Sequence, residues 1–488
     1  MTTVKAAFNR LSSILLLLII LSISLVACGE SASPTADQIS TTNTVSGITS
    51  TPVSVANTTT AFTTNTTTAT GSIIPTTTKA PIVYITIPVS NDARQSLEKV
   101  ADDAVKVRGL NFTAKITTNF MTPDAIGKYA EDSLKRELTL QEISDYEKSL
   151  LVFGFTKPGF DYVKSYTALL EGNVAGFYDY EIKKLFVNVA DPNKGASPLT
   201  RWIAEHELTH ALQDQNFGIE KVRPQRIPTD KNWSDDKDLA VLSLIEGDAV
   251  QSQFLWTLGK YLSQQEITQL VKDSQDAANK ASQVVNQMPP ILLVSQTFPY
   301  EEGWTFVQNL YKQGGWDAVN KAWTEYPPVS SSQILNFDKY KNRVEPIKVD
   351  LSDLTPVLGA GWRSVDLNTM GEYTTRVWLK GQVSNDEATK AASGWAGDRY
   401  QVLEKDGNLG YVWRSKWDND AEAKQFFDSA LRYITPTYNL QGAGGNGTKR
   451  VWQNAEQDVQ LIQKGTEVLV LVMPKGDAAA KIISTLGF

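Results

Sequence analysis

The sequence predicts an α+β protein made of two parts with different local patterns. Helical periodicity dominates residues 90–345, which also carry one β-hairpin signal, whereas residues 346–488 alternate strand-like segments, glycine-rich turns and helices. With 488 residues, of which 41% are hydrophobic, the chain is long enough to build two hydrophobic cores. We therefore expect a mainly helical domain over 90–345 and a C-terminal α+β domain over 346–488.

The N-terminus has the features of a lipoprotein export signal. Two basic residues precede an apolar run from Leu11 to Val26, which is shorter than the roughly 20 apolar residues that span a bilayer. The run leads into Val26-Ala27-Cys28-Gly29, which resembles a bacterial lipobox, and Cys28 is the only cysteine. We expect residues 1–28 to be the signal peptide and a lipidated Cys28 to anchor the protein on the extracytoplasmic side of the bacterial cell membrane. An ordinary cysteine in a secretory signal is the alternative.

The segment after the signal is expected to be a disordered tether over residues 29–85. Ser and Thr make up 25 of the 50 residues from 31 to 80. Such a segment has too little large apolar surface to offset the entropy lost on ordering.

Composition excludes several partners and sites. A net charge of -7 without a long basic run argues against nucleic acid as a partner. A single cysteine excludes disulfides within the chain, and the only two histidines, His206 and His210, must supply any imidazole that a site needs.

In the first part we expect helices and a short strand-like run (111–117) within 93–170, followed by a β-hairpin formed by residues 173–180 and 185–189. Helices are expected over 198–217 and 235–260. A further helical region, 263–345, is expected to be interrupted at Pro289-Pro290, Pro299 and Pro327-Pro328.

In the second part, a hairpin is expected from residues 400–404 and 409–414, on either side of a Lys-Asp-Gly-Asn turn. A helix over 421–433, two strands around Lys464-Gly465 and a last helix over 477–486 complete the prediction.

One short motif carries the chemistry. Residues 206–210 spell His-Glu-Leu-Thr-His, the HExxH pattern. On a helix, residues four apart lie about 40° apart around the axis, so both imidazoles can bind one zinc ion. Glu207 would then lie close enough to a metal-bound water to accept its proton without being a ligand.

The helix that this motif requires is well signalled. Ser197 followed by Pro198 is typical of a helix N-cap and first helical position. An apolar stripe lies opposite the histidines and predicts one face for packing and one for a ligand: Ala204, Leu208, Ala211 and Leu212. The alternative is two surface histidines that bind no metal. It is improbable by chance that the only two histidines of the chain lie four residues apart in this motif.

A catalytic zinc ion needs a third protein ligand, which must be an oxygen here because Cys28 is assigned to the lipid anchor. Glu246 is the best candidate, since it shares an apolar helical face on which a lone carboxylate would be costly. A buried salt bridge is the alternative explanation of Glu246. Asp214 and Asp248 are candidates to accept hydrogen bonds from the imidazoles, or are ordinary aspartates.

These residues resemble the gluzincin clan of zinc metallopeptidases, in which an HExxH helix is followed by a glutamate on a second helix. Four longer segments resemble uncharacterised bacterial HExxH lipoproteins over about residues 95–345: 174–179, 205–215, 245–249 and 298–303. The resemblance implies a zincin-like catalytic domain, Zn²⁺ as cofactor, and a hairpin edge strand that binds an extended peptide.

The chain departs from that pattern in two respects. The gap from His210 to Glu246 is longer than in thermolysin-like enzymes, which makes Glu246 less secure than the histidines. No third histidine is present to stabilise the oxyanion, so a tyrosine or arginine must do so. Tyr300 is the first candidate, with Tyr178 and Tyr340 as alternatives.

Two functions follow as hypotheses. The first is a membrane-anchored, extracytoplasmic zinc peptidase that acts on a peptide or protein substrate, with Glu207 as general base and metal ligands His206, His210 and Glu246. The alternative is a surface lipoprotein that binds a protein or cell-wall ligand and has a structural or vestigial metal site. Its support is a group of aromatic residues in the C-terminal domain: Trp395, Tyr400, Trp413 and Trp417. A regulatory role for residues 93–170 stays open, although no cysteine exists for a cysteine switch.

Overall fold

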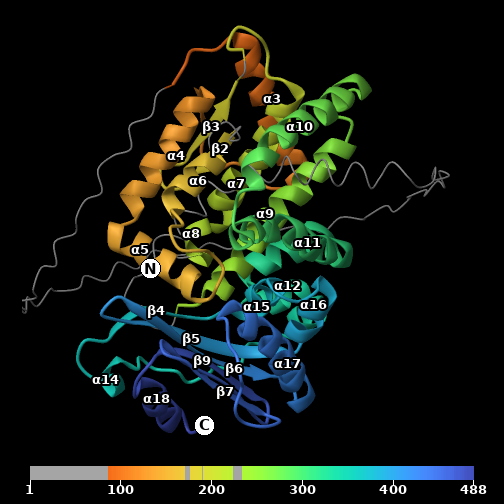
Figure 1. Ribbon diagram of the computed structural model, residues 1–488. Helices are drawn as coiled ribbons and strands as arrows, with labels where there is room; N and C mark the ends of the chain where they lie inside the picture. The colour runs from red at the N-terminus through yellow and green to blue at the C-terminus, as the bar shows by residue number, and fades with distance from the viewer. Residues whose placement is uncertain (1–85, 171–175, 190, 224–232) are drawn as a thin grey trace, which may run out of the picture.

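The computed structural model describes residues 86–170, 176–189, 191–223 and 233–488 (Figure 1). The predicted signal peptide over 1–28, with Cys28, and the predicted tether over 29–85 lie outside these residues. Among the described helices, none is both long and apolar enough to cross a bilayer.

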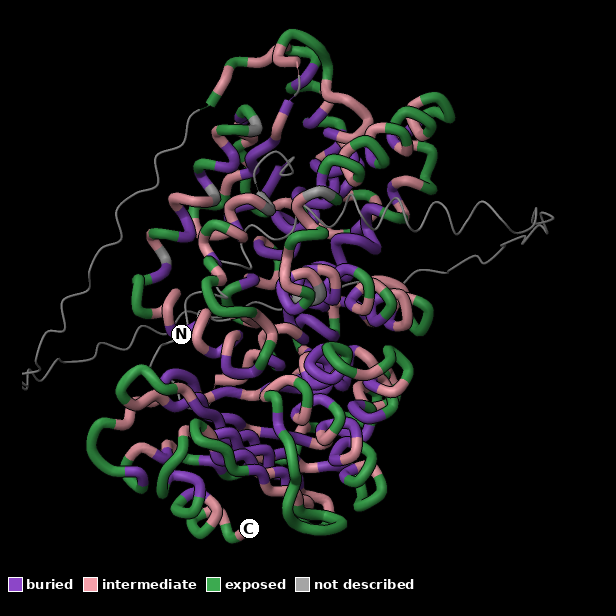
Figure 2. The backbone as a smooth tube through the Cα atoms, in the orientation of Figure 1, coloured by how far each residue is buried: buried purple, intermediate pink, exposed green. Residues whose placement is uncertain are grey.

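The predicted α+β class is confirmed. A helical part that contains a three-stranded sheet lies above a part built on a six-stranded sheet, as Figure 1 shows. Buried residues run through the centre of both parts (Figure 2).

The helical part begins with a long helix and a small sheet. Its first elements are α3 (Asn91–Arg108), β1 (Thr117–Met121), α4 (Pro123–Glu137), α5 (Leu140–Val152), α6 (Tyr162–Leu170), β2 (Gly176–Asp179) and β3 (Lys184–Asn188). The strand order is β1-β3-β2, with β1 parallel and β2 antiparallel to β3, so β2 is an edge strand. The expected hairpin is present, although residues 173–175 of its first arm lie outside the described residues.

The first strand lies later in the chain than expected. The strand predicted over 111–117 is wrong, because the structure forms β1 over Thr117–Met121 instead. Phe120 and Met121 are the buried residues of this strand, whereas residues 111–116 are mostly exposed. Burial of those two side chains against the core therefore decides where the strand forms.

The next elements form the helical core of this part: α7 (Pro198–Phe217), α8 (Ile219–Val222), α9 (Asp235–Leu258), α10 (Gln264–Val285), α11 (Pro290–Thr324), α12 (Ser331–Leu335) and α13 (Phe337–Lys341). The predicted interruption at Pro299 is wrong, because α11 continues through this residue. The helix is kinked instead at Gly314 and Gly315, where the backbone leaves helical geometry and Gly315 has a φ of 60°.

Helices α9 and α11 cross in backbone contact. A Cβ atom on Gly247 would lie 2.2 Å from the carbonyl oxygen of Gly303, and one on Gly303 would lie 2.3 Å from that of Ser243. Only glycine allows this approach. The crossing lies one residue after Glu246 and therefore fixes the position of that carboxylate.

The C-terminal part is an antiparallel sheet covered by helices. Its elements are α14 (Thr355–Leu358), β4 (Arg363–Asn368), α15 (Gly371–Lys380), α16 (Asn385–Ser393), β5 (Trp395–Lys405), β6 (Asn408–Trp417), α17 (Asp420–Thr437), β7 (Lys449–Gln453), β8 (Gln457–Lys464), β9 (Glu467–Pro474) and α18 (Ala478–Leu486). The strand order is β4-β5-β6-β9-β8-β7. The expected hairpin is present as β5 and β6, and both strands are longer than predicted because both bury aromatic side chains.

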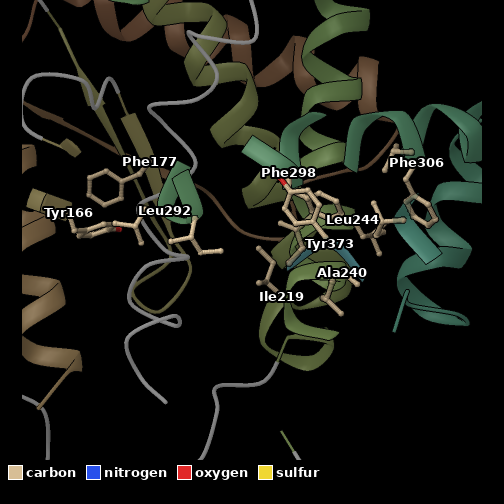
Figure 3. Packing of buried hydrophobic residues seen from close by; sticks show 14 of the residues in the cluster. Tyr166, Phe177, Ile219, Ala240, Leu244, Leu292, Phe298, Phe306 and Tyr373 are labelled. Atoms are coloured by element: carbon tan, nitrogen blue, oxygen red, sulfur yellow. The ribbon is translucent and has the colours of Figure 1, made fainter. Parts of the chain in front are cut away.

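One hydrophobic cluster joins the two parts. Tyr373 and Val377 of α15 belong to the same buried cluster as residues of α4, α9 and α11. The rings of Phe298 and Tyr373 lie 3.9 Å apart between centroids, and Figure 3 shows them packed together. The helical part therefore completes its core with side chains from the C-terminal part.

Candidate metal centre

Helix α7 holds both histidines and begins where the sequence predicts. The hydroxyl of Ser197 accepts a hydrogen bond of 3.0 Å from the Thr200 backbone N–H, which caps the helix. The expected division of α7 is present: the apolar stripe packs into the core and both histidines face Glu246, although every residue from Trp202 to Asp214 is buried. Packing of α3, α9 and β2 around α7 explains why the histidine side is covered too.

Three side chains from α7 and α9 converge on one point. The Nε2 atoms of His206 and His210 lie 3.0 Å apart, and Oε2 of Glu246 lies 3.2 Å from the first and 3.3 Å from the second. All three side chains are buried, and the group could hold a metal ion. The structure thus brings together the three residues that the sequence nominated as ligands.

The spacing of these atoms matches a tetrahedral metal site. Metal–ligand distances of roughly 2.0–2.1 Å place tetrahedral ligand atoms about 3.3–3.4 Å apart. The three observed separations, 3.0, 3.2 and 3.3 Å, are close to this value. Two imidazole nitrogens and one carboxylate oxygen also leave a fourth direction open for water or substrate.

Gln213 orients one imidazole, and sequence reasoning missed it. Its Oε1 lies 2.9 Å from Nδ1 of His210, while its Nε2 donates to the carbonyl of Ile245 over 3.0 Å. The second bond fixes the amide so that its oxygen accepts from Nδ1–H, which leaves Nε2 of His210 as the metal-facing atom. The only signal in the sequence was a polar residue three positions after the second histidine.

The two aspartates proposed as partners of the imidazoles do something else. Asp248 forms a bidentate ion pair with the buried Arg108, at 2.6 and 2.9 Å, and also accepts from the indole of Trp323. Asp214 accepts from the Tyr178 hydroxyl at 2.9 Å and from the Lys183 ammonium group at 2.7 Å. Their predicted role as imidazole acceptors is therefore wrong.

Glu207 lies between the histidines and the edge strand. Its Oε2 accepts a hydrogen bond of 2.9 Å from the Tyr178 backbone N–H in β2. Its Oε1 is buried and has no hydrogen-bond partner within the described part of the chain. Burial raises the pKa of Glu207 to about 8, although the nearby His210 acts in the opposite direction.

Two members of the ligand group are in the protonation state that a metal needs, whereas His210, whose pKa is raised, would release a proton when a cation binds. Burial lowers the pKa of His206 to about 4, so this imidazole is neutral, as a metal ligand must be. Burial also lowers the pKa of His210, but the Glu246 carboxylate outweighs this effect and raises it to about 9. Burial raises the pKa of Glu246, and the two imidazoles more than offset it, so the carboxylate stays ionised.

The three candidate tyrosines lie in different places. The ring of Tyr300 is stacked beside that of His206, with centroids 6.0 Å apart, so this residue adjoins the ligand group. Tyr178 lies beside Glu207 through its backbone, while its hydroxyl binds Asp214. The Tyr340 hydroxyl donates to the carbonyl of Tyr326, so the structure does not bring it to the histidines.

A buried arginine near Glu246 was also missed. The guanidinium of Arg223 donates to both carboxylate oxygens of Asp238, at 2.8 and 2.7 Å. Burial lowers the pKa of Arg223, but Asp238 and, to a smaller extent, Glu246 raise it above its usual value. No local pattern in the sequence connects Arg223 with α9, because residues 224–234 separate them.

The family match found for this chain lies in the C-terminal part. Residues 358–483 match a family model described as a domain of unknown function, DUF8575. No curated protein matches the chain significantly. Among solved structures, a candidate hydrolase with a novel fold from Chloroflexus aurantiacus is 16% identical, with a TM-score of 0.35. That similarity covers 52% of this chain and 92% of the other.

Proposed function

We propose that this protein is a zinc-dependent peptidase, anchored through Cys28 to the extracytoplasmic side of a bacterial membrane. The observation that carries the proposal is the convergence of His206, His210 and Glu246 on one point, with the Glu207 carboxylate beside them. A site that merely holds a structural metal has no use for a base at this position.

The donor set favours zinc. Two imidazole nitrogens and one carboxylate oxygen, with a fourth position left open, are typical of catalytic zinc sites. When bound by these three residues, zinc would supply Lewis acidity and lower the pKa of a coordinated water from 15.7 to roughly 7.

The chain's own residues would then move the protons. The charge of a bound zinc ion would keep Glu207 ionised despite its burial. Its carboxylate takes a proton from the attacking water and later delivers it to the leaving amine. Its Oε2 is occupied by the Tyr178 N–H, so Oε1 is the atom that accepts the proton. Tyr300, beside His206, is the side chain that we assign to stabilise the developing oxyanion.

The alternative, a surface lipoprotein that recognises its ligand through C-terminal aromatic residues, loses its support. Trp395, Tyr400, Trp413 and Trp417 are all buried in the core of the C-terminal part. They are therefore not available as a contact surface.

The direct test is peptide cleavage by the purified protein before and after removal of its metal. We expect about one zinc ion per chain, loss of peptide cleavage after chelation, and recovery when zinc is restored. A protein that takes up no zinc, or cleaves a broad peptide library equally well after chelation, would refute the proposal.

A further inference from the structure

A second site lies where helix α9 meets the C-terminal part. A cavity of about 80 Å³ is enclosed by α5, α9, the start of α11, α15 and the strands β4 and β5. Figure 1 shows α5 and α15 at the junction of the helical part with the six-stranded sheet. Most of its wall is aliphatic or aromatic, including Leu150, Leu242, Ile291, Met370 and Tyr373.

The cavity lies in line with the metal ligand Glu246. Asp235, Leu239 and Leu242 line it from α9, and helical geometry places all three within about 40° of Glu246 around the axis. At 1.5 Å per residue, they lie roughly 6 to 17 Å from Glu246 along the helix. The same stripe of α9 therefore faces the cavity and carries the carboxylate of the metal group.

Arg223 connects the two regions. Its guanidinium binds both oxygens of Asp238, a residue of the cavity wall, and its charge also interacts with that of Glu246. The cavity wall and the metal group thus share one electrostatic environment.

We propose that this cavity receives a large apolar side chain of the peptide substrate, about two to five residues from the scissile bond. This inference rests on the proposed function. An extended peptide advances about 3.3 Å per residue, so a chain whose scissile bond lies at the metal group reaches the cavity within that number of residues. The C-terminal part, through Met370 and Tyr373, would then determine specificity.

The polar groups of the wall define what the cavity excludes. Asp235, Asp238 and Asp366 line it, and no lysine, arginine or histidine is among the described residues of the wall. An acidic side chain would meet like charge there, whereas leucine, methionine or phenylalanine would bury apolar surface.

The test compares wild type with Thr374→Phe, which places a ring in the cavity from α15 and changes no residue of α7 or α9. Thr389→Phe on α16, outside the cavity wall, is the matched control. We expect wild type to favour a leucine or phenylalanine at one substrate position over glycine by at least about tenfold in kcat/KM. Thr374→Phe should lower kcat/KM for the leucine peptide to the value for the glycine peptide, while the control keeps the tenfold preference.

Failure of this inference is distinguishable from failure of the proposed function. A wild type that cleaves peptides without the preference, or a preference that survives Thr374→Phe, overturns the cavity assignment and leaves the peptidase standing. Binding of labelled leucine and glycine peptides to zinc-loaded Glu207→Gln tests the cavity assignment without requiring cleavage. Equal dissociation constants for the two peptides overturn the cavity assignment. A tenfold difference between them that Thr374→Phe removes supports it. Leu150→Phe, which enters the cavity from α5, repeats the test if Thr374→Phe does not fold.

Discussion

The backbone N–H of Tyr178 donates a 2.9 Å hydrogen bond to the carboxylate of Glu207. This bond joins the edge strand β2 to the residue that follows the first histidine. The donor belongs to the main chain, so among substitutions of Tyr178 only proline removes it. The hairpin that precedes the HExxH helix therefore holds the orientation of Glu207, the residue that we propose as general base.

Glu207→Gln should keep zinc and lose turnover. The amide oxygen can still accept from Tyr178, but the side chain cannot carry a proton between water and amine. General acid–base groups contribute about 10²- to 10⁴-fold, so we expect kcat to fall within this range. Zinc content by mass spectrometry and kcat on a fluorogenic peptide measure the two effects. Glu220→Gln, exposed on α8, is the matched control, and undiminished cleavage by Glu207→Gln would contradict the mechanism.

Zinc should stabilise the wild type, and Glu246→Gln should largely lose this effect. A ligand that binds only the folded state adds about 2.7 kcal/mol at a free concentration of 100 Kd. The amide is a weak ligand, so the same zinc concentration should raise the midpoint of thermal unfolding far less in the variant. Calorimetric scans with and without zinc measure the shift. If zinc raised the midpoint of thermal unfolding equally in both proteins, Glu246 would not be a zinc ligand.

Gly247→Ala should destabilise the fold and weaken zinc binding together. The added Cβ would lie 2.2 Å from the Gly303 carbonyl oxygen, so α9 and α11 must move apart beside Glu246. We expect a loss of at least about 2 kcal/mol in unfolding free energy by urea denaturation. Gly195→Ala, whose Cβ would approach nothing closer than 3.8 Å, should change little. Equal stabilities of the two variants would disprove the close crossing.

Asp248→Asn tests whether this residue is structural. It leaves the fully buried Arg108 guanidinium without its bidentate partner, which costs about 3–5 kcal/mol in comparable pairs. Asp132→Asn breaks a surface pair with Lys128 and should cost no more than about 1 kcal/mol. Urea denaturation compares the two variants. If Asp248→Asn changed the unfolding free energy little but abolished zinc binding, Asp248 would instead be part of the metal site.

Asp236→Asn should make the protein less sensitive to rising pH. Burial, together with the charges of Asp398 and Glu372, raises the pKa of Asp236 to about 7. Hydrogen bonds from Ser331 act in the opposite direction but do not cancel this shift. The folded state therefore retains a proton on Asp236 that the unfolded chain loses near pH 4. The stability that protonated Asp236 contributes is thus fully present below about pH 4 and is lost as the pH rises toward 7. Relative to wild type, the variant should gain up to about 4 kcal/mol across this interval. Urea denaturation at a series of pH values checks this, and a constant difference between the proteins would contradict it.

The sequence was most informative where a local signal and burial agree. The helix predicted over 198–217 ends at the same residues in the structure, because Ser197 and Pro198 determine its start and Gly218 follows its last residue. Glu246 was nominated because a carboxylate on an apolar helical face needs a partner, and it contacts both imidazoles.

Features that depend on contacts between distant segments were not predictable in this way. Asp248 lies two residues from Glu246 along the helix, yet its partner Arg108 comes from α3, 140 residues earlier. Arg223 and the Gly247–Gly303 crossing likewise depend on the packing of helices whose relative positions no local pattern encodes. Local chemistry thus identified the three residues of the candidate metal group, and tertiary packing determined what supports them.

Contact between Phe298 and Tyr373 has a practical consequence for dissecting the protein. A fragment that stops at residue 345 would lose Tyr373 and Val377 and expose aromatic surface to water. Such a fragment should be insoluble, whereas a protease cut near residue 345 in the intact molecule should yield two pieces that co-elute. Recombinant expression should therefore include both the helical part and the C-terminal part, not only the segment that carries the histidines.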